Sequence, residues 1–268
     1  MSPRRRLLVA VVVALLLVGG VVVGMRLLPS AEPAVDPVAR PAQDRPGPVL
    51  LVPGYGGSRG GLQRLAARIE ATGRSATVLT LVGDGTGDLS AQVALLDAAV
   101  DTALTAGAPS VDVVGYSAGG VVTGLWVARD GGAAKARRVV TLGSPLAGTS
   151  LAATASVVAP DACPTACRQL APGSAEITEL ARSRAGGAVP WLSVWTADDD
   201  TVTPPATASQ LPGTVQLQIQ AVCPGARVTH SALPTDPAVT GLVVRALSAD
   251  PLDSAATGAD CAELRAAG

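Results

Sequence analysis

Short apolar segments alternate with longer segments of helical periodicity through the central part of the chain. The apolar segments are continuous runs rich in valine and leucine, which is typical of strands that are buried on both faces. They occupy residues 48–52, 76–82, 111–115, 137–143, 190–196 and 214–222. Between them apolar residues recur at helical spacing, and the predicted helices include 61–73, 89–106, 118–130 and 237–248.

Strands that recur with helices between them form βαβ units, and right-handed crossovers then give a parallel sheet. We therefore predict an α/β fold class, with a minimal, doubly wound, mainly parallel sheet of about six strands and helices on both faces. Residues 144–189 interrupt this alternation with one short helical pattern, "GSAEITELARS". We expect that segment to lie over the carboxyl ends of the strands.

The N-terminus carries an uninterrupted apolar run at residues 7–25, directly after Arg4, Arg5 and Arg6. At 1.5 Å per helical residue this run would extend about 28 Å, close to the thickness of a bilayer's hydrocarbon core. The arginines would stay in the cytoplasm, so the rest of the chain would be exported. A cleaved signal peptide is the alternative, but its apolar region is usually only about 7–15 residues long, and the following residues offer a poor cleavage site. We expect an extracytoplasmic protein, tethered to the membrane by this segment or secreted if it is cleaved.

Four segments follow from these patterns. Residues 1–28 form the anchor or signal segment, and residues 29–48 form a proline-rich linker that behaves as an extended spacer. Residues 49–250 form one folded domain, and residues 251–268 form a C-terminal tail. The net charge of −1 and the isoelectric point near 5.8 indicate no excess of positive charge, so we expect no nucleic-acid partner.

The four cysteines are Cys163, Cys167, Cys223 and Cys261. An even number in an exported domain indicates two disulfides, for which three pairings are possible. The simplest pairs Cys163 with Cys167 and Cys223 with Cys261. A zinc site is less favoured, because the C-x₃-C pair has no C-x₂-C partner and the chain has one histidine.

We expect neither a metal nor a cofactor. Asp84 and Asp88 in "GDGTGDL" could be taken for calcium ligands. Their spacing fits a turn residue and a helix cap better.

The stretch "VDVVGYSAGGVV" places Ser117 in a G-x-S-x-G pentapeptide between a predicted strand and a predicted helix. Glycine-rich chains contain this pentapeptide by chance, so the structural context decides its meaning. A strand, a tight turn and a helix form the setting of a nucleophile elbow, which exposes a strained serine at a helix N-terminus. The backbone N–H of Ala118 would then be one donor of an oxyanion hole.

A serine hydroxyl needs a base, and the only imidazole of the chain is His230, after the sixth predicted strand. A lone histidine is often a structural residue, but its position C-terminal to the other candidates favours catalysis. Asp198, Asp199 and Asp200 follow the fifth predicted strand, and one of them could orient the imidazole. The alternative is a solvated acidic turn. The order Ser, Asp, His is that of a hydrolase triad.

With these motifs, the chain resembles the α/β-hydrolase superfamily, and in particular small secreted or membrane-tethered lipase-like esterases of actinobacteria related to the class 2 lipases. The resemblance covers about residues 48–248 and rests on "PVLLVPGYGGS", "VDVVGYSAGGVV", "RRVVTLGSPLAGT", "WTADDDTVTPP" and "CPGARVTHSALP". It implies that Ser117 is the nucleophile and His230 the base. The family's D-x-x-V pattern selects Asp199, and Tyr55 would give its backbone N–H to the oxyanion.

The resemblance implies an enzyme that cleaves carboxylic esters of small molecules or lipids through an acyl-enzyme, as an esterase or a lipase. No long apolar lid is visible, which weakens the case for a lipase that acts at an interface. The same triad could serve a thioesterase, an amidase or an acyltransferase. An alternative from a different functional class is a membrane-tethered binding protein with a catalytically inactive hydrolase fold. Such proteins usually lack a triad member or an elbow glycine, and none is missing here.

Overall fold

The computed structural model describes residues 2–3, 40–252 and 256–268. Backbone contacts divide the chain into two units, Met1–Pro37 and Val38–Gly268, and the folded domain is the second unit. The apolar segment predicted at residues 7–25 lies outside the described residues. Within the described parts of the chain, no helix has the length and hydropathy needed to cross a membrane.

The second unit is built on one sheet in which all six strands are parallel, in the order β2-β1-β3-β4-β5-β6. The strands are β1 (Val49–Val52), β2 (Ala76–Val78), β3 (Val111–Tyr116), β4 (Ala136–Leu142), β5 (Trp191–Trp195) and β6 (Val215–Gln218). The longer helices are α2 (Gly60–Glu70), α3 (Leu89–Thr105), α4 (Ala118–Arg129), α6 (Ser150–Val158), α8 (Ala175–Arg182) and α11 (Pro237–Ala246). Shorter ones are α5 (Gly132–Lys135), α7 (Thr165–Gln169), α9 (Ala185–Ala188), α10 (Ile219–Val222) and α12 (Cys261–Ala267). The predicted parallel sheet is confirmed.

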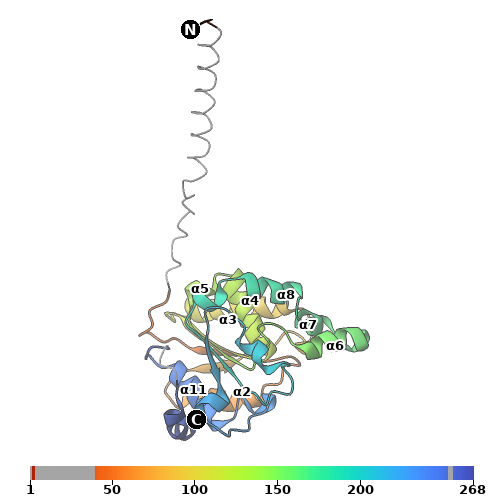
Figure 1. Cartoon of the computed structure of the whole chain (residues 1–268). Helices are drawn as coiled ribbons and strands as arrows, with labels where there is room; N and C mark the ends of the chain where they lie inside the picture. The colour runs from red at the N-terminus through yellow and green to blue at the C-terminus, as the bar shows by residue number, and fades with distance from the viewer. Residues whose placement is uncertain (1, 4–39, 253–255) are drawn as a thin grey trace. The chain divides into compact units, whose positions relative to one another are not determined.

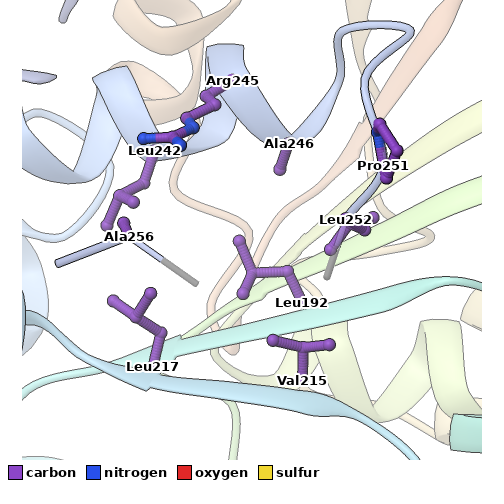
Figure 2. Close-up of a pocket in the computed structure, with 9 residues that line it drawn as sticks. All are labelled: Leu192, Val215, Leu217, Leu242, Arg245, Ala246, Pro251, Leu252 and Ala256. Atoms are coloured by element: carbon purple, nitrogen blue, oxygen red, sulfur yellow. The ribbon is translucent and has the colours of Figure 1, made fainter. Parts of the chain in front are cut away.

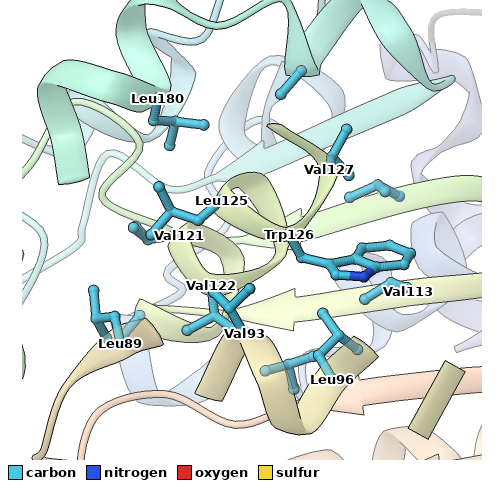
Figure 3. Close-up of a cluster of buried hydrophobic side chains, with 14 of the residues drawn as sticks. Leu89, Val93, Leu96, Val113, Val121, Val122, Leu125, Trp126, Val127 and Leu180 are labelled. Carbon is cyan, nitrogen blue, oxygen red and sulfur yellow. The ribbon is translucent and has the colours of Figure 1, made fainter. Parts of the chain in front are cut away.

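Helices cover both faces of the sheet, as predicted: α3, α4, α5 and α8 lie on one face, and α2 and α11 on the other (Figure 1). On the first face, the central helix α4 is apolar around almost its whole circumference and is buried between α3, α8 and the sheet. Figure 3 shows this core, with Trp126 and Leu125 of α4 packed between Leu96 of α3 and Leu180 of α8. On the second face, Leu65 of α2 packs with residues of α11 in a separate core.

The segment 144–189 lies only in part where we expected it. Its beginning lies at the carboxyl edge of the sheet, where Ser150 N–H donates to the carbonyl of Thr203 in the loop after β5, at 2.7 Å. Its later helices, α8 and α9, instead pack against α4 and extend the helical layer. The amphipathic sequence of α8, which buries Ile177 and Leu180, explains why it joins that layer.

Two predicted strands are too long. The second ends at Val78 instead of residue 82. The N–H of the next residue, Leu79, still donates to the carbonyl of Leu51 at 2.9 Å, and the chain then leaves the edge of the sheet. The sixth ends at Gln218 instead of residue 222, and α10 follows it at once. One helical turn buries both Ile219 and Val222, which a continued strand would not place on a common face.

The C-terminal segment is part of the domain and not only a tail. Its helix α12 buries Leu264 and is tied by the Cys261–Cys223 disulfide to the end of α10. The second disulfide joins Cys163 and Cys167, so the structure has the simplest of the three possible pairings.

An apolar pocket lies where the C-terminal segment meets β5, β6 and α11. Leu252 and Ala256 face Leu192 and Leu217 of the sheet and Leu242 of α11 (Figure 2). The C-terminal segment therefore completes the apolar wall of the second core.

Buried charges fix the amino edge of the sheet, opposite the edge at which Ser117 lies. Asp112 of β3 forms ion pairs with Arg137 of β4 and, at 2.7 Å, with Arg74. The Arg137 guanidinium also donates to the carbonyls of Gln43 and Ser248, at 2.9 Å each. These contacts tie the incoming chain and the end of α11 to the central strands, because a buried charge must be paired and hydrogen-bonded.

Candidate active site

Ser117 lies in the one-residue turn between β3 and α4. Its φ of 54° makes it the only residue other than glycine with a positive φ among the described residues. Neighbouring glycines permit this turn: a Cβ on Gly119 would lie 2.2 Å from the carbonyl oxygen of Val52, and one on Gly115 would lie 2.5 Å from Gly120 Cα. A strained serine between glycines at a strand–helix junction is the geometry of a nucleophile elbow.

His230 lies beside this serine, although 113 residues separate the two in sequence. It begins a short 3₁₀ helix, His230–Ala232, in the loop between α10 and α11. Its Nε2 atom is 2.9 Å from Ser117 Oγ, and only 7% of its side chain is exposed. The imidazole is therefore shielded from water and within hydrogen-bonding distance of the serine.

Asp199 contacts the other nitrogen of the same imidazole. Its Oδ2 atom is 2.8 Å from His230 Nδ1, and 1% of its side chain is exposed. Its Oδ1 atom accepts hydrogen bonds from the backbone N–H groups of Thr201, at 3.0 Å, and Val202, at 2.7 Å. These donors satisfy the buried carboxylate and hold it against the histidine.

The other two aspartates of the "DDD" stretch have different neighbours. Asp198 Oδ2 accepts from Gln220 Nε2, and its Oδ1 forms an ion pair with the exposed Arg227, both at 3.4 Å. Asp200 is exposed and accepts from Thr201 Oγ1 at 3.3 Å. Asp199 is thus the member of the three that contacts His230.

The two expected oxyanion donors lie on either side of the serine. Ala118 is the first residue of α4, and Tyr55 follows Gly54, where an added Cβ would lie 2.8 Å from Ser117 Cβ. Neither amide donates a hydrogen bond to another group in the part of the chain that the structure describes. Their role as oxyanion donors remains a prediction.

An open cleft of about 280 Å³ lies over Ser117 and His230. Its wall contains no side chain with a permanent charge and is formed by Gly54, Tyr55, Ser58, Gly61, Leu62, Tyr116, Ser117, Thr201, His230, Ser231 and Pro234. Both tyrosines of the chain line it. Burial and the Asp84 charge raise the pKa of Tyr55, while burial and the charges of Asp199 and Asp200 raise the pKa of Tyr116 to about 12. Both phenols are therefore uncharged O–H groups near neutral pH.

The sequence analysis missed several residues that support the site. Gly143 follows β4 with a φ of 53°, and a Cβ there would lie 3.1 Å from Asp199 Oδ2 and 3.2 Å from His230 Nδ1. The glycine directly after a predicted strand, in "TLGSP", was the available signal. Tyr116 also contacts His230, at both its ring and its carbonyl, and nothing in the local sequence indicated this.

The cysteines and the two aspartates considered as metal ligands have other contacts in the structure. All four cysteines form disulfides. Asp84 accepts from the N–H and the hydroxyl of Thr86, at 3.0 Å and 2.6 Å, and Asp88 caps α3 by accepting from Ser90 N–H at 2.8 Å. Within the described residues, no group of three or more His, Cys, Asp or Glu side chains could hold a metal ion.

No family model and no curated protein sequence matches the chain. Solved structures do. Lipase B of Aspergillus fumigatus superposes with a TM-score of 0.63 at 18% identity, over 78% of this chain, which spans only 55% of the length of that lipase. The mature lipase BlEst2 of Bacillus licheniformis superposes with a TM-score of 0.62 at 16% identity, over 80% of this chain and 96% of that one.

The monoacylglycerol lipase of Paleococcus ferrophilus is similar over more of the chain but less closely. Its TM-score is 0.50 at 15% identity, over 86% of this chain and 97% of that one. At these identities the likeness is one of fold. With its parallel sheet, its helices on both faces and a serine turn after the central strand, the chain has the α/β-hydrolase fold.

Proposed function

We propose that the chain is a serine hydrolase that cleaves carboxylic esters, with Ser117 as nucleophile, His230 as general base and general acid, and Asp199 as the acid of the triad. One observation carries this proposal: Ser117 Oγ, the two nitrogens of His230 and Asp199 Oδ2 form a continuous chain of contacts of 2.9 Å and 2.8 Å. A nucleophile within reach of a base, itself oriented by a buried carboxylate, is the arrangement that activates a serine.

The contacts assign the tautomer of the imidazole. A carboxylate only accepts hydrogen bonds, so Nδ1 carries the proton that Asp199 Oδ2 accepts. Nε2 is then unprotonated and can take the hydroxyl proton of Ser117 as Oγ attacks the ester carbonyl.

The attack forms a tetrahedral oxyanion beside the N–H groups of Ala118 and Tyr55 and at the N-terminus of α4, whose dipole favours negative charge. Nε2–H then protonates the leaving alcohol as the C–O bond breaks, which leaves an acyl group on Ser117. Water, deprotonated by the same nitrogen, then attacks that acyl group. The bond between the acyl carbon and Ser117 Oγ breaks, Nε2–H returns its proton to Oγ, and the acid is released. The hydrolysis balances as ester plus water giving acid plus alcohol.

An ester substrate is also supported by the solved structures, since the similar proteins of Aspergillus fumigatus and Bacillus licheniformis are lipases. The lining of the cleft also suits a neutral acyl group, because it contains no permanently charged side chain. A thioesterase, an amidase or an acyltransferase would use the same acyl-enzyme, and a catalytically inactive binding protein would not react at Ser117.

A second candidate is a lipase that works at a lipid surface, and α6 favours it. This helix contains no charged residue, and Leu151, Val157 and Val158 are 52%, 80% and 76% exposed. It starts next to the loop that carries Asp199, through the Ser150–Thr203 contact. An exposed apolar helix whose first residue contacts the Asp199 loop could contact aggregated substrate.

The two disulfides support an extracytoplasmic location, because such bonds persist in oxidising compartments. Tethering through residues 7–25 remains a proposal that rests on their sequence.

The test is hydrolysis of p-nitrophenyl esters from acetate to palmitate by the full chain, beside the Ser117→Ala variant. We expect at least about a thousand-fold loss of kcat in that variant, with full activity in Ser183→Ala, a serine at the end of α8 that does not line the cleft. A fluorophosphonate probe should label the wild type at Ser117. Turnover that survives in Ser117→Ala, or a wild type that neither turns over nor reacts with the probe, would refute the proposal.

The same series separates the two candidates. An esterase prefers the short, soluble esters, whereas a lipase prefers long chains and gains activity on an emulsion. If the chain is a lipase, Val157→Asp should lower activity on the emulsion and leave acetate hydrolysis unchanged. Ala67→Asp, on the exposed face of α2, should change neither of these activities.

A further inference from the structure

Tyr116 is the residue directly before the serine, and the sheet fixes its backbone. It is the last residue of β3 and lies in register with Leu142 of β4. The next N–H, that of Ser117, donates to the carbonyl of Leu142 at 2.9 Å. Any group held by the Tyr116 side chain is therefore held in a fixed relation to the nucleophile.

The group that this side chain holds is His230, at two places. The phenol O–H donates to the main-chain carbonyl of His230 at 3.2 Å. The tyrosine ring also lies against the imidazole, with ring centroids 5.1 Å apart and planes inclined by 31°. One contact fixes the backbone of the histidine and the other limits the tilt of its ring.

These contacts act on the triad distance that Asp199 does not set. The contact between Asp199 Oδ2 and His230 Nδ1 fixes the position of the Nδ1 end of the imidazole. The Nε2–Oγ distance instead depends on how the loop between α10 and α11 approaches the end of β3. The bond from the Tyr116 hydroxyl to the His230 carbonyl joins these two elements, across a separation of 114 residues.

The phenol keeps the proton that this role requires. Burial, followed by the negative charges of Asp199 and Asp200, raises the pKa of Tyr116 to about 12. Because the O–H is engaged with a main-chain carbonyl, it is not free to stabilise an oxyanion. Its effect on the reaction therefore passes through the histidine.

We propose that Tyr116 is a positioning residue that sets the approach of His230 to Ser117, through its hydroxyl on the histidine carbonyl and its ring on the imidazole. This inference rests on the proposed triad. It predicts that the aromatic ring and the hydroxyl contribute separately, and that both contributions act on the chemical step and not on substrate binding.

The test compares Tyr116→Phe, which removes the hydroxyl only, with Tyr116→Leu, which removes the ring as well. Steady-state kinetics with p-nitrophenyl acetate give kcat and KM, and the second-order rate constant of fluorophosphonate labelling reports nucleophile activation with a different leaving group. Thr102→Val, on the exposed face of α3, is the matched control, because it also removes a hydroxyl that donates to a main-chain carbonyl, at 2.8 Å.

We expect kcat and the labelling rate to fall together by about 3- to 10-fold in Tyr116→Phe, with KM within about two-fold of the wild type. Tyr116→Leu should lose about ten-fold more, so that phenylalanine rescues part of the activity. If leucine prevents folding, the phenylalanine variant alone decides. Unchanged kcat and labelling in Tyr116→Phe, or a loss confined to KM, would overturn the inference.

Failure of the proposed function looks different. In that case the wild type itself shows no Ser117-dependent turnover and no labelling, whatever residue stands at position 116. If the wild type reacts and the Tyr116 variants react equally fast, the triad stands and only the positioning role is refuted.

Discussion

Gln220 Nε2 donates a hydrogen bond to Thr196 Oγ1 over 2.8 Å, and the same hydroxyl donates to the carbonyl of Val228 over 2.7 Å. Thr196 begins the loop that carries Asp199, and Val228 belongs to the loop that carries His230. The Oε1 atom of Gln220 also accepts from Ala197 N–H at 3.0 Å. The Thr196 hydroxyl therefore joins the two loops whose side chains meet in the candidate triad, and the half-buried Gln220 amide holds that hydroxyl and the neighbouring Ala197 N–H.

Replacing Gln220 by alanine should loosen both loops at once. The change removes the acceptor of the exposed Ala197 N–H and one donor to the Thr196 hydroxyl, so we expect a free energy of unfolding lower by about 0.5–1.5 kcal/mol. We also expect kcat for p-nitrophenyl acetate to fall about ten-fold. Gln220→Glu keeps an acceptor for Ala197 N–H, but it removes the Nε2 donor and places a carboxylate beside Asp198, so it should not restore kcat. Gln63→Ala, at an exposed glutamine of α2, should match the wild type, and an equally active Gln220→Ala would contradict the linking role.

The three adjacent aspartates offer a direct test of the proposed acid. Asp199→Ala removes the only carboxylate at His230 Nδ1, and we expect kcat to fall by about a thousand-fold or more. Asp200→Ala removes an exposed carboxylate that accepts from Thr201 Oγ1, and its kcat should stay within about three-fold of the wild type. Ester hydrolysis by both variants, measured at equal protein concentration, gives the ranking. Equal losses, or the opposite order, would exclude Asp199 as the acid.

The sequence predicted the sheet because buried parallel strands leave a strong local signal, as in the apolar runs before Ser117 and before the aspartates. The serine turn was predictable for the same reason: a strand, a G-x-S-x-G turn and a helix are contiguous in sequence. Family resemblance was needed to select Asp199 over its neighbours. In the structure the choice depends on which carboxylate the loop buries, and no local pattern records that.

The contacts that support the site were not predictable, because they join residues far apart in the chain. Tyr116 and His230 are separated by 114 positions. The strand predicted over residues 214–222 includes Gln220. In the structure the strand ends at Gln218, and the turn into α10 directs the Gln220 amide to the Asp199 loop. Local alternation over so few residues fits a strand as well as a strand followed by one helical turn.

Gly143 is expected to be irreplaceable for two separate reasons. Its φ of 53° strains any other residue by about 1 kcal/mol, and an added Cβ would lie 2.5 Å from Leu233 Cδ1 and close to the Asp199–His230 contact. Gly143→Ala should therefore lower both stability and kcat. Gly131→Ala, at a φ of 67° with open space around it, should cost stability alone. Thermal melting and ester hydrolysis of the pair separate strain from displacement of the triad, and full activity in Gly143→Ala would show that the triad tolerates the methyl group.

The two disulfides should differ in their contribution to stability. Cys223 and Cys261 close a loop with a sequence separation of 38, and Cys163 and Cys167 one with a separation of 4. In the chain-entropy description, removing them costs about 4 and about 2 kcal/mol respectively. The Cys223→Ser, Cys261→Ser double variant should thus show the larger fall in Tm in calorimetry. A larger fall in the Cys163→Ser, Cys167→Ser variant would mean that the C-terminal helix is held by packing and not by its disulfide.

Alkaline pH should weaken the fold through Tyr116. Its pKa rises from 10.0 in a free phenol to about 12, first because of burial and then because of Asp199 and Asp200. A folded-state pKa that is raised means that the folded protein holds the proton more tightly. The stability that this proton contributes is fully present below pH 10 and is lost as the pH rises through 12.

The Tyr116→Phe variant has no such proton. We expect the stability difference between the wild type and Tyr116→Phe, from urea midpoints, to be constant up to about pH 10 and then to shift against the wild type. Tyr55 titrates in both proteins and cancels in the comparison. A difference that stays constant through pH 12 would show that the phenol ionises as easily in the folded protein as in the unfolded chain, and would remove the electrostatic part of the argument for a protonated donor on the His230 carbonyl.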